Sequence, residues 1–294
     1  MLHRLCTART LWMDGTFSVN PTIFAQLYTV LVKINEEYVP LLWCLLPDKQ
    51  GATYIRLFQL LQQEAVRMNL ILQPTTIHID FEQAVMHAVR QVFGIEASGC
   101  LFHFCQNVLR HVQQTGLQTA YNSNNPPEGR KWIRRLIALP LVPPLRIDQA
   151  FQAVVANAPV VQGRDQLHDY IRDTYVDVNG AQFGRDIWNC FGVRDRTTNA
   201  CEGYHSVLSA HFRGRHADPF TFVKFLQQHE METEIRIGQL QLGAPPRKRK
   251  NKYVLVDEAL DRLRDHYFGT GLPNVARVLQ YMDAVAHQLY DVKH

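Results

Sequence analysis

Short apolar runs rich in β-branched and aromatic residues recur through the first hundred positions and predict β-strands. These runs are Leu11–Met13, Gln26–Lys33, Pro40–Leu46, Thr75–Ile79 and Ser98–Phe104. A short polar stretch separates the second run from the third, which predicts a hairpin. Two of the predicted strands stop at an acidic residue, the first at Asp14 and the fourth at Asp80.

Apolar residues at helical spacing predict amphipathic helices between and after these strands. The predicted helices are Ala52–Asn69, Glu82–Phe93 and Gln106–Thr115. Strands and helices that alternate in this way indicate an α/β fold with a mixed sheet and flanking helices rather than a helical bundle.

Beyond this region the strand pattern disappears. Residues 122–192 contain the helical segments Lys131–Leu139, Asp148–Asn157 and Asp165–Tyr175, and they predict an all-helical insertion. After the insertion, Thr197-Thr198-Asn199 offers N-cap residues for a helix to about Phe212. Its predicted apolar stripe consists of Ala200, Tyr204, Val207, Leu208 and His211.

The remaining helices are predicted at Asp218–Glu234, Asp257–His266 and Asn274–Leu289. The expected organisation is a core in two parts, residues 8–121 and 193–236, with the helical insertion 122–192 between them. A basic linker, residues 237–252, and C-terminal helices, residues 253–294, follow.

Composition narrows the class of protein only slightly. The chain has 294 residues, is 46% hydrophobic and carries a net charge of +4, which suits a globular protein and is compatible with a polyanionic partner. No apolar run approaches the roughly 18 residues of a membrane span, and the first residues do not resemble a secretory signal. The six scattered Cys favour a reducing, intracellular compartment.

The candidate chemistry lies in acidic residues. Carboxylates at strand ends are rigidly held, and two hard divalent cations need such oxygen ligands to clamp a phosphoryl displacement. For each aspartate there is an alternative, because Asp before Gly stabilises turns and Asp after a strand often caps the next helix. Glu202 lies opposite the predicted stripe of its helix, where a solvent-facing residue and a cleft-facing residue give the same pattern.

Four sequence blocks resemble those of Mutator-like element (MULE) transposases. Met13–Phe17 resembles the first block, which reads "DGTF", and Asp80–Ala84 resembles the Asp-x-Glu-x-Ala run of the second. Cys100-Leu101-Phe102-His103 is similar to the family's Cys-x-x-His segment. Arg196–His205 is similar to the third block, in which an Asn-rich cap precedes a catalytic Glu. The blocks occur in the family's order and span residues 11 to 225.

The resemblance implies a ribonuclease H-like five-stranded core in which Asp14, Asp80 and Glu202 are the catalytic and metal-binding triad. It implies two Mg²⁺ or Mn²⁺ ions, with Glu82, Cys100 and His103 as supporting residues. The implied activity is DNA strand cleavage and strand transfer on double-stranded DNA, both transposon ends and target DNA. Because such transposases usually act as dimers or larger assemblies, the resemblance also implies a homo-oligomer.

Family members usually carry a separate DNA-binding module before the catalytic core, whereas this sequence starts almost at the first strand. A truncated or domesticated copy, or a fragment, is therefore expected. The alternative function is a catalytically silent DNA- or protein-binding factor derived from a transposase.

Cysteine and histidine suggest two further sites. Cys100, His103 and Cys105 form one possible half of a zinc site, but no good second pair completes the usual four ligands. A Cys–His catalytic dyad would need an orienting carboxylate beside the pair, and the sequence places none there.

The basic run Arg247–Lys252 suggests a nuclear localisation signal or a contact with DNA phosphates, and a solvated loop is the alternative. Its candidate DNA-binding residues are Arg247, Lys248, Arg249 and Lys250. Arg130-Lys131 and Arg134-Arg135 in the insertion are further candidates for phosphate contacts, although surface helices often look alike.

Overall fold

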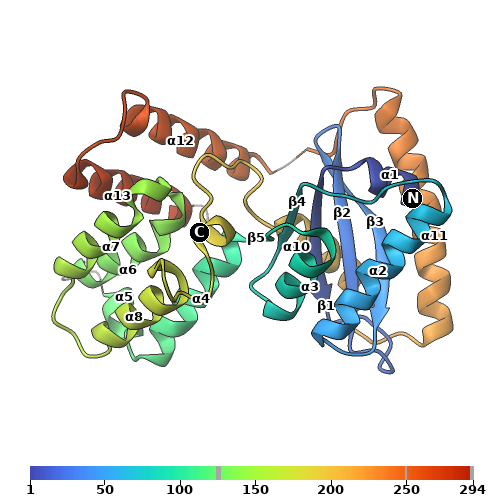
Figure 1. The fold of residues 1–294 in the computed structure, drawn as a ribbon, viewed down its shortest axis with the longest axis horizontal. Helices are drawn as coiled ribbons and strands as arrows, with labels where there is room; N and C mark the ends of the chain where they lie inside the picture. Colours follow the sequence, from blue (N-terminus) through green and yellow to red (C-terminus); the bar gives the residue numbers. More distant parts are fainter. Residues whose placement is uncertain (124–126, 249, 292–294) are drawn as a thin grey trace. The chain divides into compact units, whose positions relative to one another are not determined.

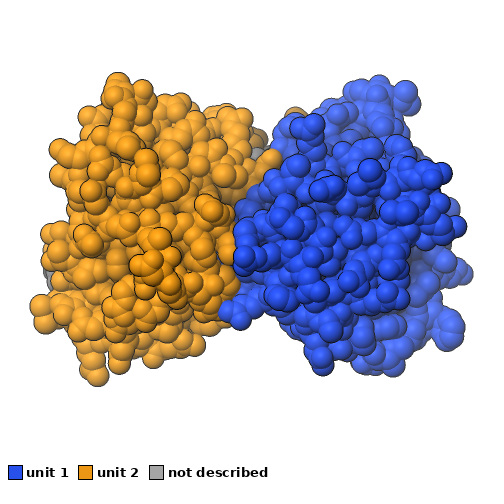
Figure 2. Space-filling model, viewed as in Figure 1, with its two compact units in different colours: residues 1–100, 197–247 blue, residues 101–196, 248–294 orange. Residues whose placement is uncertain are grey.

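The computed structural model describes residues 1–123, 127–248 and 250–291. It contains two compact units, which Figure 2 shows in different colours. Unit 1 consists of residues 1–100 and 197–247, and unit 2 consists of residues 101–196 and 248–294. Each unit is therefore assembled from two separate stretches of the chain.

Unit 1 is built on a five-stranded mixed sheet with the strand order β3-β2-β1-β4-β5 (Figure 1). The strands are β1 (Thr10–Thr16), β2 (Gln26–Ile34), β3 (Glu37–Leu46), β4 (Thr76–Ile79) and β5 (Ser98–Gly99). β1, β2 and β3 pair antiparallel, whereas β1, β4 and β5 pair parallel. The predicted mixed five-stranded α/β sheet is confirmed.

The hairpin between β2 and β3 turns at Asn35 and Glu36, whose φ angles are 45° and 67°. A two-residue turn with both φ angles positive matches the twist of the flanking strands, and Asn tolerates this conformation well. The predicted fifth strand is too long. Only Ser98–Gly99 pairs with β4, and Leu101–Phe104 already belongs to a helix of unit 2.

Helices cover both faces of the sheet of unit 1. They are α1 (Leu2–Thr7), α2 (Gly51–Arg67), α3 (Gln83–Phe93), α10 (Asn199–His211) and α11 (Pro219–Gln241). On one face, Tyr54 of α2 packs against Tyr28, with 5.3 Å between ring centroids. On the other face, Cys201 of α10 packs with Trp12 and Leu31. The residues after position 196 thus complete a core begun by the first hundred.

Unit 2 is helical throughout its described residues. Its helices are α4 (Leu101–Gln114), α5 (Gln118–Asn122), α6 (Glu128–Ala138), α7 (Ile147–Ala156), α8 (Arg164–Ile171), α9 (Arg185–Trp188), α12 (Asn251–Phe268) and α13 (Val275–Asp291). Two 3₁₀ turns, Leu139–Leu141 and Pro144–Arg146, and a π-helical turn, Arg172–Val176, connect some of them.

The C-terminal helices belong to the same unit as the helical insertion. Tyr281 of α13 donates a hydrogen bond to the carbonyl of Leu141 at 2.9 Å. Lys131 and Arg135 of α6 form ion pairs with Asp283 of α13, and Arg130 donates to backbone carbonyls. Arg130, Lys131 and Arg135, which were considered for phosphate contacts, therefore make contacts inside unit 2.

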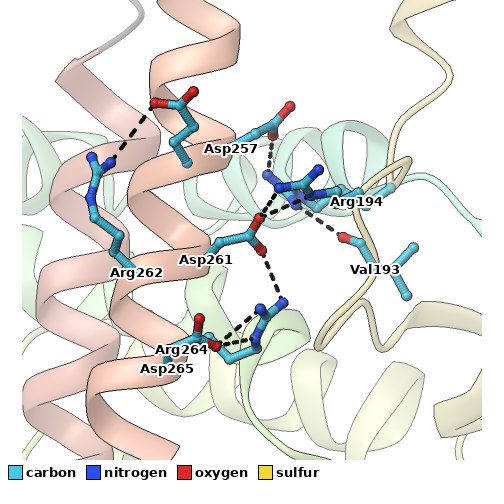
Figure 3. Close-up of polar contacts among 9 residues, drawn as sticks. Val193, Arg194, Asp257, Asp261, Arg262, Arg264 and Asp265 are labelled. Atoms are coloured by element: carbon cyan, nitrogen blue, oxygen red, sulfur yellow. Dashed lines mark hydrogen bonds and ion pairs between the residues drawn. The ribbon is translucent and has the colours of Figure 1, made fainter. Parts of the chain in front are cut away.

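An ion-pair network links α12 to the loop that precedes α10 (Figure 3). The Arg196 side chain is only 7% exposed and donates to the Val193 carbonyl and to Asp257. Arg194 donates to Asp261 at 2.8 Å, and Arg264 reaches the same carboxylate at 2.9 Å. Figure 3 shows Arg194 and Arg264 contacting the same carboxylate, that of Asp261.

Two local predictions are wrong in detail. The buried face of α10 consists of Cys201, His205 and Leu208, whereas Val207, assigned to the apolar stripe, is 60% exposed. α12 begins at Asn251 rather than Asp257, so Lys252 of the basic run lies in a helix and not in a loop.

Candidate active site

The register of the sheet brings Asp14 and Asp80 to neighbouring positions. β1 and β4 are parallel, and Trp12 is paired with His78. Each aspartate follows its member of this pair by two residues, so Asp14 and Asp80 continue the same face of the sheet. Asp80 directly follows β4, whereas β1 continues through Thr16 and does not stop at Asp14 as predicted. Both side chains are partly buried.

Each aspartate also stabilises its local backbone. Asp14 Oδ1 accepts a hydrogen bond from the amide of Gly15 at 2.9 Å, and Asp80 Oδ1 accepts one from the amide of Glu82 at 3.1 Å. Asp14 is paired with Thr29 inside β1 rather than standing in a turn, and the N-cap of α3 is Glu82 rather than Asp80. Each contact engages one carboxylate oxygen, that of Asp14 within β1 and that of Asp80 directly after β4.

Helix α10 carries Glu202 in its first turn, on the face of the sheet that also carries Asp14. The N-cap is Thr198, as predicted, but its side chain makes no capping hydrogen bond. The backbone amide of Thr198 instead donates to Cys100 Sγ at 3.2 Å. Cys100 is fully buried and so holds the beginning of the helix that bears Glu202.

One turn after Glu202, His205 reaches the first aspartate. His205 Nδ1 lies 3.5 Å from Asp14 Oδ2, and His205 Nε2 lies 2.8 Å from Thr29 Oγ1. Because residues three apart on a helix are neighbours, Glu202 and His205 share one side of α10. This contact was not predicted from the sequence, where His205 was only the last residue of a motif.

Glu82 lies within electrostatic reach of both aspartates. Burial raises the pKa of its carboxyl group, and the charges of Asp80 and Asp14 raise it further, while a hydrogen bond from Tyr54 and the charge of Lys49 lower it. Burial also raises the pKa of Tyr28 well above its usual range, with Asp80, Asp14 and Glu82 acting in the same direction. Negative charge is therefore concentrated at this edge of the sheet.

A buried chain of hydrogen bonds ends on Glu82. Gln26 Nε2 donates to the Tyr54 hydroxyl at 2.6 Å, and that hydroxyl donates to Glu82 Oε1 at 3.0 Å. Tyr54 is 0% exposed and Gln26 is 1% exposed. Neither residue was singled out from the sequence, because nothing local distinguishes a buried polar residue that contacts distant elements.

Lys49 is the cation next to these carboxylates. Its charge lowers the pKa of Glu82, and its Nζ atom stands 3.7 Å from the centroid of the Phe17 ring. Phe17 is 46% exposed, and Lys49 is exposed as well. An exposed cation beside an acidic edge can contact a phosphate group without neutralising the carboxylates.

The basic segment is only partly available to a polyanion. The Arg247 side chain is 80% exposed, but its Nε lies 3.4 Å from Glu37 and its backbone amide donates to the same carboxylate at 2.8 Å. Lys248 and Lys250 are exposed, and Arg249 lies outside the described residues. His103, the other member of the Cys-x-x-His segment, lies in α4 of unit 2.

The donor chemistry of this edge fits a divalent cation. Mg²⁺ and Mn²⁺ prefer carboxylate oxygens, and Asp14, Asp80 and Glu82 supply them on neighbouring segments. Within the described residues, no group of three or more His, Cys, Asp or Glu side chains has a geometry that would hold a metal ion. The same holds for the zinc site considered at Cys100.

Comparison with known families identifies the segment that carries the first two aspartates. Residues 10–107 match the MULE transposase domain. The match confirms the resemblance over about a third of the chain and includes Asp14, Asp80, Glu82, Cys100 and His103, whereas Glu202 lies beyond it. It indicates a transposase-related function and an interaction with DNA.

No curated protein matches the chain. In the part of the chain that the structure describes, none of the helices combines the length and the apolar character that crossing a membrane requires.

Proposed function

We propose that this protein cleaves DNA strands and transfers them by divalent-metal phosphoryl transfer, with Asp14, Asp80 and Glu202 as its catalytic triad. The observation that supports the proposal is the register of β1 and β4, in which Trp12 pairs with His78 two residues before Asp14 and Asp80, within the segment that matches the MULE transposase domain. The strand order β3-β2-β1-β4-β5, with β2 antiparallel to its neighbours, supports a ribonuclease H-like core.

Each of these residues of unit 1 would have a separate role. Asp14 and Asp80 would hold two Mg²⁺ or Mn²⁺ ions, with Glu202 completing the second position from α10. The ions would supply Lewis-acid stabilisation of the attacking and leaving oxygens. Cys100 would fix the start of α10 through Thr198, and Lys49 would bind a DNA phosphate near the carboxylates.

The test is cleavage of labelled double-stranded DNA by the full chain with Mn²⁺. We expect nicking by the wild type and its loss in Asp80→Asn, which keeps the side-chain size and removes the charge. Glu64→Gln is a matched control, because Glu64 is an exposed carboxylate on α2 that pairs with Arg67. Equal cleavage by wild type and Asp80→Asn would refute the assignment of the site.

Calorimetric titration separates the proposal from its rival. DNA binding without Mn²⁺ binding would identify a transposase-derived factor that has kept the fold and lost the chemistry. Mn²⁺ binding that disappears in both Asp14→Asn and Glu202→Gln would place the two residues in one site. Binding that persists unchanged in Glu202→Gln would exclude Glu202 from it.

We propose further that the basic segment acts in nuclear import or DNA contact through Lys248 and Lys250, two of the exposed cations among its described residues. A fluorescent fusion of the chain should accumulate in nuclei and lose this accumulation in the double variant Lys248→Ala, Lys250→Ala. If the double variant remains nuclear and binds DNA normally, the segment has neither role.

A further inference from the structure

We infer that the loop between α10 and α11, residues 212–218, binds the backbone of double-stranded DNA through Arg213 and Arg215, about three to four base pairs from the cleaved bond. The inference rests on the proposed function. It adds a segment that positions DNA and that lies outside the four sequence blocks.

The direction of α10 places this loop beyond the end of β1. α10 lies on the face of the sheet that carries Asp14, and its contacts follow β1 in the same direction. In chain order they join Cys201 to Trp12, His205 to Asp14, and Leu208 to Leu27, the partner of Thr16. At 1.5 Å per residue, Arg213 therefore stands about 12 Å further along than His205.

The loop is fastened to the segment that directly follows β1. Phe212 and Ala217, near its two ends, pack against a buried cluster that includes Val19. Between them, His216 Nδ1 donates to the backbone carbonyl of Asn20 at 2.7 Å. Asn20 is 3% exposed, and its own side chain donates to a backbone carbonyl at 2.6 Å. The ends of the loop are thus fixed, and its central residues project from the fold.

The exposed part of the loop carries two arginines on either side of Gly214. Arg213 has a φ angle of 51°, in the left-handed region that glycine and asparagine adopt most readily. An arginine kept at such a position indicates that its side chain has a role other than shaping the turn. Arg213 and Arg215 are exposed, and neither forms an ion pair within the described part of the chain. Both guanidinium groups are therefore available to an anion.

Double-stranded DNA fits the spacing and the charge of this surface. A duplex rises 3.4 Å per base pair, so the roughly 12 Å between the level of His205 and Arg213 corresponds to about three to four base pairs. Asp218, the acidic residue nearest to the arginines in sequence, instead accepts hydrogen bonds from backbone amides at the start of α11. Lys49, beside Phe17 at the other end of the segment after β1, adds a further exposed cation. Guanidinium groups bind phosphates through paired hydrogen bonds and carry no sequence information there.

The experiment measures binding of the full chain to labelled double-stranded DNA at a series of salt concentrations, without a divalent metal. Each phosphate contact contributes about 0.9 to the slope of log affinity against log salt concentration. We expect the double variant Arg213→Gly, Arg215→Ala to bind every DNA sequence more weakly and to lower this slope by about 2. Glycine suits the left-handed backbone at position 213, so the variant should fold.

The matched control is the double variant Arg56→Ala, Arg67→Ala, which removes the same charge from unit 1. Both arginines are exposed on α2, which packs against Tyr28 on the other face of the sheet. The control should keep the slope of the wild type. If the two double variants lower the slope equally, the effect is one of net charge and the inference is wrong.

The position of the contact is tested with duplexes that carry a single uncharged methylphosphonate. About three to four base pairs from the bond that the wild type cleaves, this group should weaken wild-type binding and leave binding by the loop variant unchanged. Equal weakening of both proteins at that position would overturn the placement of the loop.

The outcomes separate this inference from the proposed function. If the wild type cleaves DNA and the loop variant keeps the wild-type slope, the inference is wrong and the proposed function stands. If the wild type binds DNA but cleaves none with Mn²⁺, the proposed function is wrong, and the slope still decides whether the loop binds DNA. If the wild type binds no DNA, both are wrong.

Discussion

His205 on α10 and Asp14 on β1 face each other across 191 positions of the chain, with Nδ1 3.5 Å from Oδ2. The hydroxyl of Thr29, 2.8 Å from Nε2, holds the other side of the imidazole ring. With a proton on Nδ1, the imidazole ring would donate a hydrogen bond to the Asp14 carboxylate. Residues that surround a metal site orient its ligands through hydrogen bonds of this kind.

We therefore expect His205→Ala to weaken Mn²⁺ binding about 10–100-fold. Calorimetric titration measures the affinity, and circular dichroism establishes that the variant is folded. His211→Ala is the control, because His211 lies on the same helix and contacts Phe225 instead of the aspartate. An unchanged affinity in His205→Ala would show that Asp14 needs no support from α10.

Substitution at Gly15 tests the space beside the first aspartate. Gly15→Ala introduces a methyl group where Gln26 Oε1 lies, so the Gln26 side chain must move and lose its contact with Tyr54. We expect a loss of about 1–3 kcal/mol in the free energy of unfolding, measured with urea.

Gly238→Ala is the matched control for this prediction. Gly238 lies in α11, and no atom stands within 4 Å of the position of a Cβ there. An alanine in a helix interior is expected to stabilise the protein by about 0.5–1 kcal/mol. If Gly15→Ala were as stable as the wild type, Gln26 would not need its present position.

The ion pair of Glu37 makes the stability of the folded protein depend on pH. The hydrogen bond from Arg236 lowers the pKa of Glu37, assisted by the backbone amide of Arg247 and opposed by burial. Because the pKa is lower in the folded state, this contribution to stability is fully present above the unfolded value of about 4.3 and is lost as the pH falls through the folded value.

Glu37→Gln should therefore destabilise the protein at pH 7, by about 1–3 kcal/mol, because Arg236 loses a carboxylate that is itself 5% exposed. The difference from the wild type should shrink below about pH 4. Urea unfolding at a series of pH values measures it. A difference that stayed constant down to pH 3 would contradict the assignment.

The network of Figure 3 makes a separate prediction for unit 2. Asp257→Asn leaves the Arg196 guanidinium, 7% exposed, without its carboxylate, and should lower the free energy of unfolding by about 1–3 kcal/mol. Glu258→Gln is the control, because its pair with Arg262 is exposed on the same helix and should contribute little. Equal stability of the two variants would show that Arg196 does not depend on Asp257.

The sequence predicts the sheet well because strand patterns are local. Each strand of unit 1 coincides with an apolar run of the sequence. The predicted end of β1 at Asp14 is wrong, because Gly15 and Thr16 continue the strand by pairing with Tyr28 and Leu27. The face of α10 was misjudged at Val207, because a hydrophobic side chain on a helix does not reveal whether another element covers it.

Only those residues of the candidate site that lie in sequence motifs could be predicted. Asp14 and Asp80 stand out because each directly follows an apolar run. The family resemblance adds Glu202, which nothing in its own helix distinguishes from a surface residue. Gln26, Tyr54 and His205 were missed because their partners come from other elements of the fold. Such residues become visible only when the register of the sheet and the packing of its helices are known.

The division of unit 1 into two stretches has a consequence during synthesis. The ribosome completes all five strands by residue 100, but Cys201, which covers Trp12 and Leu31, follows about a hundred residues later. At roughly 5–20 residues per second, that interval lasts on the order of 5 to 20 s. For this time the nascent sheet exposes an apolar face, so this protein should need a chaperone until α10 emerges.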